Sequence, residues 1–248
     1  MGRATTTSLK NNKKPKARVQ PPVEAELDLV RQLSIFDPTK FAEERIDVIG
    51  VGAVGSHVAW FLAKTGFKNI HVWDDDIVAS HNVPNQQFFL DQVGQTKVAA
   101  LAENIMRATG VMVAMHPVKF IGQEGLGKHV FLGVDSMEAR KSIFDLSIRM
   151  KLGIETMFET RIGSDICRIY LISPISPAQI RGWEETLYLD SEAEVSLCGT
   201  VPSIITTSSL AAAAAVWQFI KWLSSRDVEN ELVIGFRPAF NVLTRKFI

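Results

Sequence analysis

Cysteine is scarce in this sequence, which holds only Cys167 and Cys198 among 248 residues. Two thiols cannot form a disulfide framework or, by themselves, a four-thiolate zinc site. The N-terminus lacks an apolar signal segment. We therefore expect a reduced, cytoplasmic protein.

An excess of charge and an unbroken apolar run are also missing. Lysine plus arginine number 27 and aspartate plus glutamate number 27, so the formal net charge is zero. This balance gives no support for nucleic acid or an anionic membrane surface as a partner. Polar residues interrupt the longest apolar stretch, 204–223, which predicts a buried helix rather than a membrane span. We expect neither nucleic acid nor membrane as a partner.

The first 20 residues differ from the rest in composition. They carry six basic residues, no acidic residue and almost no large apolar side chain. Such a segment cannot bury a core, so 1–20 is predicted to be a disordered basic tail. It is either a solubilising tail or a docking arm for an acidic partner. Residues 21–248 are predicted to form a single domain.

Strands and helices alternate along that domain. Strands are expected at 46–49, 70–73, 111–118, 130–134, 153–159, 167–172, 231–236 and 240–247, and helices at 54–65, 96–109, 137–150 and 203–224. This order predicts an α/β fold with a Rossmann-like, mostly parallel sheet. Helices should cover both faces, with a short C-terminal strand pair in addition.

A glycine-rich turn follows the first strand. Gly50, Gly52 and Gly55 form the pattern G-x-G-x-x-G, which suits a tight turn, close approach of a phosphate, and close helix packing. The next helix directs its free N–H groups at any anion bound there. Asp74, at the end of the second strand, is placed to accept hydrogen bonds from a ribose. The sequence therefore predicts a nucleotide at this turn.

Asp74 and Asp135 each follow a separate apolar strand. In an open α/β sheet, ligands bind outside the carboxyl ends of the strands, so both carboxylates are expected to face one crevice. One would serve the ribose, and the other could hold Mg²⁺ against phosphates. The alternative for Asp135 is a helix N-cap.

Five ordered motifs make the chain similar to a known family. It resembles the ThiF/MoeB/HesA family, the adenylating core shared with ubiquitin-activating enzymes, over most of the chain from Arg31 onward. The motifs are the glycine turn 50–56, Asp74-Asp75-Asp76-Ile77-Val78, Asn82-Val83-Pro84-Asn85-Gln86, Gly94-Gln95-Thr96-Lys97-Val98 and Val134-Asp135-Ser136.

The resemblance implies a reaction and a set of roles. The C-terminal carboxylate of a ubiquitin-like (β-grasp) protein or a peptide attacks the α-phosphorus of ATP, which gives an acyl-adenylate and pyrophosphate. Arg31 would reach the ATP of the partner subunit, so a homodimer is implied. In the implied site Gly50, Gly52 and Gly55 carry ATP, Asp74 binds the ribose, Lys97 the phosphates and Asp135 Mg²⁺, while Asp76, Asn82, Asn85 and Gln86 line the nucleotide.

The chain also departs from the family pattern. Asn85 stands where the family has an arginine. Loss of a charge-assisted hydrogen bond of roughly 1.5–3 kcal/mol would slow adenylation by about one to two orders of magnitude. Arg161 is a candidate to compensate, with a structural ion pair as the alternative. The two C-x-x-C pairs of many relatives are absent, so no zinc is expected.

Cys198 precedes the Ala-rich helix near the place where relatives carry cysteines. A thiol at a helix N-terminus has a lowered pKa, so Cys198 is a candidate for thioester formation. The alternative is a buried packing residue. Cys167 lies in an apolar strand and is expected to be inert.

Two other functions compete with adenylation. The glycine turn and Asp74 alone would suit an NAD-dependent oxidoreductase, although Asn82, Gln86 and Lys97 have no evident task in hydride transfer. A weakly active or inactive ThiF-like binding subunit is the third possibility, and Asn85 favours it. Activity of the purified homodimer would distinguish an enzyme from such a subunit.

Overall fold

The computed structural model describes residues 26–122, 125–163, 166–192, 203–235 and 241–247. The 1–20 tail therefore lies outside the described residues and stays a prediction. The strands are β1 Ile46–Ile49, β2 Ile70–Trp73, β3 Ala114–His116, β4 His129–Leu132, β5 Thr156–Ile162, β6 Ile166–Ile172, β7 Glu231–Gly235 and β8 Asn241–Arg245. The helices are η1 Pro38–Phe41, α1 Gly55–Thr65, η2 Leu90–Gln92, α2 Lys97–Thr109, α3 Met137–Ile143, the π-helix η3 Phe144–Ile148, α4 Pro177–Glu184, η4 Asp190–Glu192 and α5 Ile205–Ser225.

These strands form one eight-stranded sheet in the order β3-β2-β1-β4-β5-β6-β7-β8. The strands from β3 to β5 pair in parallel, and those from β5 to β8 pair antiparallel. The strand order reverses between β1 and β4, which makes their carboxyl ends the switch point where ligands bind in open α/β sheets. The α/β prediction is confirmed, and the expected C-terminal strand pair continues the main sheet through β6.

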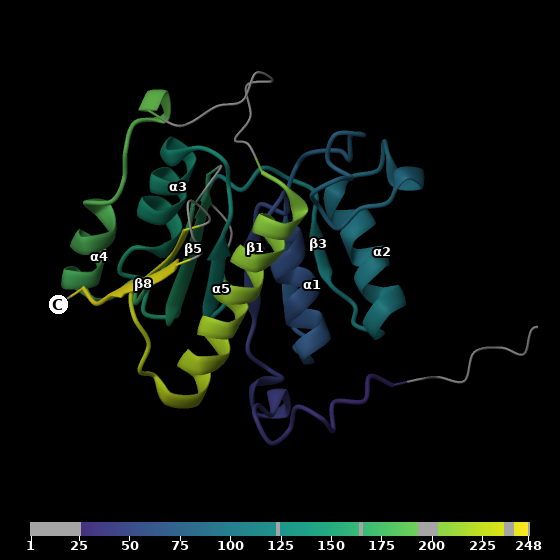
Figure 1. Ribbon diagram of the computed structural model, residues 1–248, viewed down its shortest axis with the longest axis horizontal. Helices are drawn as coiled ribbons and strands as arrows, with labels where there is room; N and C mark the ends of the chain where they lie inside the picture. The colour runs from purple at the N-terminus through teal and green to yellow at the C-terminus, as the bar shows by residue number, and fades with distance from the viewer. Residues whose placement is uncertain (1–25, 123–124, 164–165, 193–202, 236–240, 248) are drawn as a thin grey trace, which may run out of the picture.

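Alternate side chains of the strands fill two separate cores, one on each face of the sheet. On β1, Val48 points to a core that also contains residues of α1, α2 and α5, whereas Ile49 packs with α3, η3 and α4. On β4, Phe131 and Leu132 divide between the same two cores. This alternation follows from the two-residue period of a strand. Helices therefore cover both faces, and α5 lies beside α1 on one of them (Figure 1).

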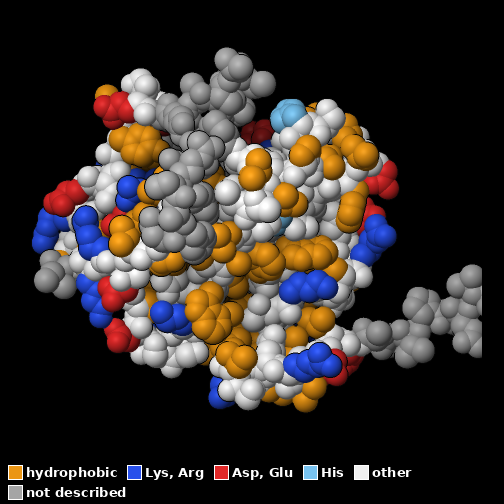
Figure 2. Space-filling view, in the orientation of Figure 1, with side chains coloured by type: hydrophobic (Ala, Val, Ile, Leu, Met, Phe, Trp, Pro, Cys, Tyr) orange, Lys and Arg blue, Asp and Glu red, His pale blue; other side chains and the backbone are white. Residues whose placement is uncertain are grey.

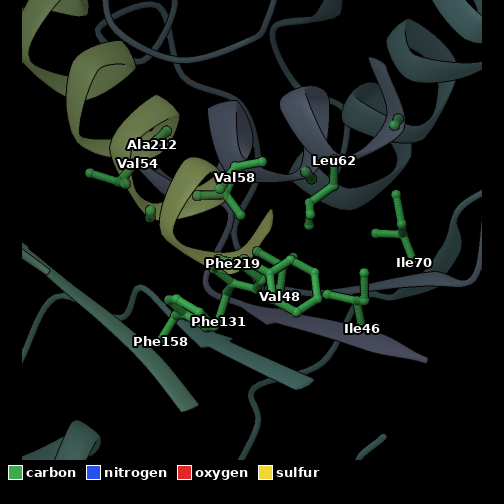
Figure 3. Packing of buried hydrophobic residues seen from close by; sticks show 14 of the residues in the cluster. Ile46, Val48, Val54, Val58, Leu62, Ile70, Phe131, Phe158, Ala212 and Phe219 are labelled. Carbon is green, nitrogen blue, oxygen red and sulfur yellow. The ribbon is translucent and has the colours of Figure 1, made fainter. Parts of the chain in front are cut away.

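Phe219 of α5 is the centre of the core under α1 and α5 (Figure 3). Its ring packs edge to face on Phe131 and Phe158, with ring centroids 5.5 Å apart in both pairs. Val48 and Val58 lie beside it in the same cluster. This packing fixes α5 against the strands whose ends carry the candidate site.

The outer surface of α1 and α5 is partly apolar. Figure 2 shows apolar side chains gathered along the middle of the face that these two helices form. Trp217 of α5 is 52% exposed, and Trp60 and Phe61 of α1 are half-buried. In the described part of the chain, no helix combines the length and apolar character that crossing a membrane requires.

Two elements differ from their predicted ranges. The helix expected at 137–150 is α3 followed by η3, whose last turn closes through a hydrogen bond from Arg149 N to Phe144 O at 2.8 Å. The strand expected at 111–118 is paired only over β3. Pro117 follows β3 directly and has no N–H to continue the ladder.

Candidate functional site

The glycine turn lies between the carboxyl ends of β1 and β4. Gly50 has a φ of +84°, and a Cβ placed there would lie 2.9 Å from the carbonyl carbon and oxygen of Gly133, just after β4. A Cβ on Gly55 would lie 1.9 Å from Gly50 O, so only glycine lets α1 begin this close to the turn. A Cβ on Gly52 would meet nothing within 4 Å. The backbone at Gly52 is therefore open to a ligand.

Asp74 ties the end of β2 to this turn. Its Oδ2 accepts a hydrogen bond from Val51 N at 2.8 Å, and its Oδ1 accepts one from Asp76 N at 3.0 Å. Burial raises the pKa of Asp74, against the lowering effect of Lys97, whose Nζ is 3.9 Å from Oδ1. The carboxylate that was predicted to meet a ribose thus lies directly beside the glycine turn.

Lys97 is the first residue of α2, and its side chain is only 8% exposed. Its Nζ forms an ion pair with Asp76 Oδ2 at 2.6 Å, and its backbone N donates to Asp76 O at 2.9 Å. The carboxylates of Asp74, Asp75 and Asp76 have oxygens within 4.8 Å of one another. The structure therefore places one buried ammonium group within an acidic cluster at the carboxyl edge of β2.

Asp135 lies in the loop between β4 and α3 and is exposed. Ser136 is the N-cap of α3, because its Oγ accepts a hydrogen bond from Ala139 N at 3.0 Å. Asp135 is therefore not the cap, which removes the structural alternative for this residue. Asp135 is not part of the acidic cluster beside Lys97. Its role as a magnesium ligand stays a prediction.

The loop that contains Asn82, Asn85 and Gln86 packs over the start of α1. Asn82 O accepts hydrogen bonds from Asn85 N and Gln86 N, at 3.2 and 3.0 Å, and Asn82 Oδ1 accepts one from Ala79 N at 2.8 Å. Asn85 Nδ2 donates to Ser203 Oγ at 2.8 Å, just before α5. Asn85 Oδ1 and Gln86 Oε1 are buried and have no hydrogen-bond partner among the described residues.

His57 is a residue of this site that the sequence pattern did not single out. It is fully buried on the first turn of α1. Its Nδ1 lies 2.7 Å from Gln87 Nε2, and its Nε2 lies 3.2 Å from Asn85 O. Burial lowers the pKa of His57, which favours the neutral ring. Its position two residues after Gly55 was the one available signal, and its contacts come from a loop about 30 residues away.

Arg31 does not reach the glycine turn of its own chain. The neighbouring Gln32 donates from Nε2 to Thr65 O, the last residue of α1, at 2.7 Å. An α-helix rises about 1.5 Å per residue, so this end of α1 lies about 15 Å from Gly55. Figure 1 shows this N-terminal segment beyond the end of α1 that is remote from the site. Any role of Arg31 at a nucleotide must involve another chain.

Arg161 is committed to a structural ion pair. Its guanidinium contacts Glu159 Oε2 at 2.8 Å, donates from Nη1 to Thr186 O at 2.7 Å, and lies 4.4 Å from the centre of the Tyr170 ring. Glu159 is fully buried and also binds Arg140. The suggestion that Arg161 compensates for the missing family arginine is therefore wrong in this structure.

The two cysteines have different outcomes. Cys167 is buried in β6, and burial raises the pKa of its thiol to about 11, as expected for an inert packing residue. Cys198 lies outside the described residues, so its thioester role stays a prediction. The expectation of no zinc is likewise untested.

The site as a whole fits an anionic nucleotide. Gly52 leaves open backbone at the N-terminus of an 11-residue helix, where the N–H groups and the helix dipole favour an anion. Lys97 supplies a buried cation, and Asp74 a buried acceptor beside the turn. The backbone at Gly52 and the Lys97 ammonium would hold the phosphates, and the Asp74 carboxylate would hold the ribose.

Comparison with known proteins agrees with the motifs. Residues 30–243 match the ThiF family. The chain is 34% identical over 108 residues to the NEDD8-activating enzyme E1 catalytic subunit of Arabidopsis thaliana, covering 40% of this chain and 23% of that protein. It is 28% identical over 124 residues to the tRNA threonylcarbamoyladenosine dehydratase of Escherichia coli, covering 47% and 46%. The chain therefore spans less than half the length of these relatives.

Solved structures show the same fold. The crystal structure of E. coli MccB with ATP superposes with a TM-score of 0.63 at 14% identity, covering 84% of this chain and 65% of that chain. The crystal structure of PaaA gives a TM-score of 0.63 at 17% identity, covering 83% and 64%. Because the family match extends over most of the sequence, the chain belongs to the ThiF family.

Proposed function

We propose that this protein adenylates the C-terminal carboxylate of a ubiquitin-like protein or a peptide with ATP. The observation that supports the proposal is that Asp74 joins the glycine turn to the end of β2, with the Lys97 ammonium 3.9 Å from its carboxylate and open backbone at Gly52. Relatives and neighbours point the same way, since one is a NEDD8-activating enzyme subunit and another, MccB, has been solved with ATP.

The reaction joins two anions. A carboxylate oxygen of the substrate attacks the α-phosphorus of ATP, the bond from that phosphorus to the bridging oxygen breaks, and pyrophosphate leaves. The attacking carboxylate is already ionised, so no general base is required. Catalysis then consists of positioning and of neutralising the charge that builds on the phosphate oxygens. A divalent cation, when bound, would supply further positive charge at the phosphates, with Asp135 as its proposed ligand.

Lys97 is the group best placed to neutralise this charge. Its ammonium is buried at the carboxyl edge of the sheet and contacts Asp76, whose carboxylate is 65% exposed. An exposed carboxylate can turn away at little cost, because its pair with a lysine contributes at most about 1 kcal/mol. The ammonium can then bind a phosphate oxygen without leaving its position.

The proposed active form is a homodimer with composite sites. Arg31 lies at the end of α1 remote from the glycine turn, so it can contact a nucleotide only across an interface. The family resemblance assigns this role to an arginine at the same place in the sequence. The protein is further proposed to act in the cytoplasm.

An inactive or weakly active binding subunit is the second candidate. Two observations favour it, namely Asn85 at the family arginine position and the commitment of Arg161 to Glu159. Under this reading the nucleotide site binds ATP, but another chain performs the chemistry. An NAD-dependent oxidoreductase is not favoured by the family match.

ATP–pyrophosphate exchange by the purified protein with Mg²⁺ tests the proposal. The assay is run with and without a panel of ubiquitin-like proteins ending in Gly-Gly and a panel of peptides with free C-termini. Exchange that depends on one panel member supports adenylation and identifies the substrate class. Tight ATP binding without exchange favours the inactive subunit, and Asn85→Arg is then the first variant to make.

A further inference from the structure

A cavity of about 410 Å³ lies between α3 and the segment 187–191, which leads into η4. Its volume falls within the range of about 300–1,000 Å³ that ligand pockets occupy. Figure 1 shows η4 as a short helix above α3. A second cavity, between α4 and β8, is about half as large, at 220 Å³. The apolar walls of the larger cavity are Met137, Leu187, Tyr188 and Leu189, and Glu138, Lys141, Asp190 and Ser191 form its polar edge.

The segment that forms one wall is held at both ends. At one end, Thr186 O accepts a hydrogen bond from Arg161 Nη1 at 2.7 Å. At the other, the Asp190 carboxylate accepts hydrogen bonds from Met137 N at 2.6 Å and Glu138 N at 3.2 Å. These bonds fix the segment against α3, so the cavity is a built feature of the fold.

The cavity lies close to the proposed nucleotide site. Gly133 contacts the glycine turn, because a Cβ on Gly50 would be 2.9 Å from its carbonyl group. Met137 follows Gly133 by four residues, and an extended chain spans at most about 3.6 Å per residue. The cavity wall at Met137 is thus within about 14 Å of Gly133. Asp135, the proposed cation ligand, lies between them in the sequence.

Two of the apolar residues that line the cavity are exposed to solvent. Leu189 is 68% exposed and Tyr188 is 41% exposed, although both border a cavity. An apolar side chain placed there would remove this surface from water, which favours binding by roughly 25 cal/mol per Å² of apolar area. The four apolar walls therefore suit an apolar side chain.

We propose that this cavity is the specificity pocket for an apolar side chain in the C-terminal tail of the substrate polypeptide. This inference rests on the proposed function, because the carboxylate of that tail must lie at the nucleotide. An extended chain rises about 3.3 Å per residue, so a span of up to about 14 Å corresponds to at most about four residues. The pocket thus selects an apolar residue no more than about four positions before the C-terminal carboxylate.

A leucine scan tests this selection. Synthetic octapeptides of glycine and serine with a free C-terminus carry one leucine at each position in turn, and ATP–pyrophosphate exchange gives kcat/KM for each. A matched set of folded ubiquitin-like proteins with the same tails distinguishes a free peptide from a protein terminus. We expect leucine at one position within four residues of the end to raise kcat/KM about tenfold over the other positions, the gain of burying one such side chain.

Two variants connect the selection to the cavity. Leu189→Asp places a charge on the cavity wall and is expected to remove the tenfold preference. Leu189 is mostly exposed, so the substitution should leave folding intact, and the melting temperature and ATP affinity check this. Leu152→Asp is the matched control, because Leu152 is 87% exposed and precedes β5 at the opposite edge of the sheet. The control is expected to keep the preference.

The outcomes separate this inference from the proposed function. Exchange that occurs with equal kcat/KM for every leucine position overturns the pocket alone, as does a preference that survives in Leu189→Asp. ATP binding without exchange for any peptide or protein tail overturns the proposed function, and the pocket with it. A preference for leucine at one position within four residues of the end that Leu189→Asp abolishes and Leu152→Asp retains supports the pocket.

Discussion

Replacing Lys97 by methionine should separate the function of this residue from its contribution to stability. Methionine keeps most of the apolar stem, which is almost fully buried, and removes only the ammonium. The ammonium occupies the first position of α2, where the helix dipole disfavours a cation. Asp74 and Asp76 balance this charge in the structure, and a phosphate oxygen is proposed to take the place of Asp76.

The expected magnitudes follow from the contacts. The pair of Lys97 with the exposed Asp76 stabilises by at most about 1 kcal/mol, and the unfavourable dipole interaction costs about 0.3–1 kcal/mol. These two terms nearly cancel. Lys97→Met also removes the cation 3.9 Å from the buried Asp74 carboxylate, so the melting temperature should fall by several degrees at most, because Asp74 can respond by taking up a proton. A lost charge-assisted contact to phosphate of about 1.5–3 kcal/mol should lower kcat/KM for adenylation about 10- to 150-fold.

The assay is ATP–pyrophosphate exchange, with thermal unfolding followed by circular dichroism on the same samples. Lys68→Met is the matched control, since Lys68 is exposed and follows α1 at the end remote from the site. It should change neither quantity. Full activity of Lys97→Met would refute the assignment of this lysine to the phosphates. A loss of activity that merely parallels a large fall in melting temperature would refute the reasoning about stability.

Three further predictions concern other parts of the site. Asp135→Asn should lower the exchange rate at least tenfold without changing the melting temperature, because Ser136 caps α3; an unchanged rate would exclude Asp135 from the reaction. Arg31→Ala should be inactive as a homodimer, yet mixing it with Lys97→Met should restore ATP–pyrophosphate exchange, since a mixed dimer holds one intact composite site. If the two variants form mixed dimers and activity is still not restored, the role of Arg31 across the interface is contradicted. For His57, burial lowers the pKa in the folded state below its ordinary value of about 6.5. Below that pH the unfolded chain binds more protons than the folded one, so the free energy of unfolding should fall as pH drops below about 6.5. His57→Gln should reduce this dependence in unfolding measured at pH 7.5 and 5.5, and an equal dependence in both proteins would refute the assignment.

Much of the fold could be predicted from the sequence because its signals are local. The glycines at 50, 52 and 55 fix a turn whose geometry depends on missing side chains, and the structure has a positive φ at Gly50 and close packing at Gly55. The continuous apolar run at 130–134 predicted a buried strand, which is β4. Such patterns depend on residues near one another in the chain.

The role of Arg161 could not be predicted in the same way. Its position just after an apolar strand was compatible with a ligand contact or with an ion pair. The decision came from Glu159 on the same strand and Thr186 beyond α4, both of which bind its guanidinium. Likewise, the importance of His57 depends on Gln87 and Asn85, which reach it from a distant loop.

The sequence by itself determined the α/β order, the glycine turn and the residue types at the strand ends, since each is encoded in short-range periodicity and spacing. Only the tertiary structure decided which side chains meet. It joined Lys97 to Asp76 and Arg161 to Glu159, made Ser136 rather than Asp135 the N-cap of α3, and placed the wall 187–191 against α3. The physical reason is that buried charges and hydrogen-bonding groups must find partners, and the packing of distant segments determines which partners are within reach.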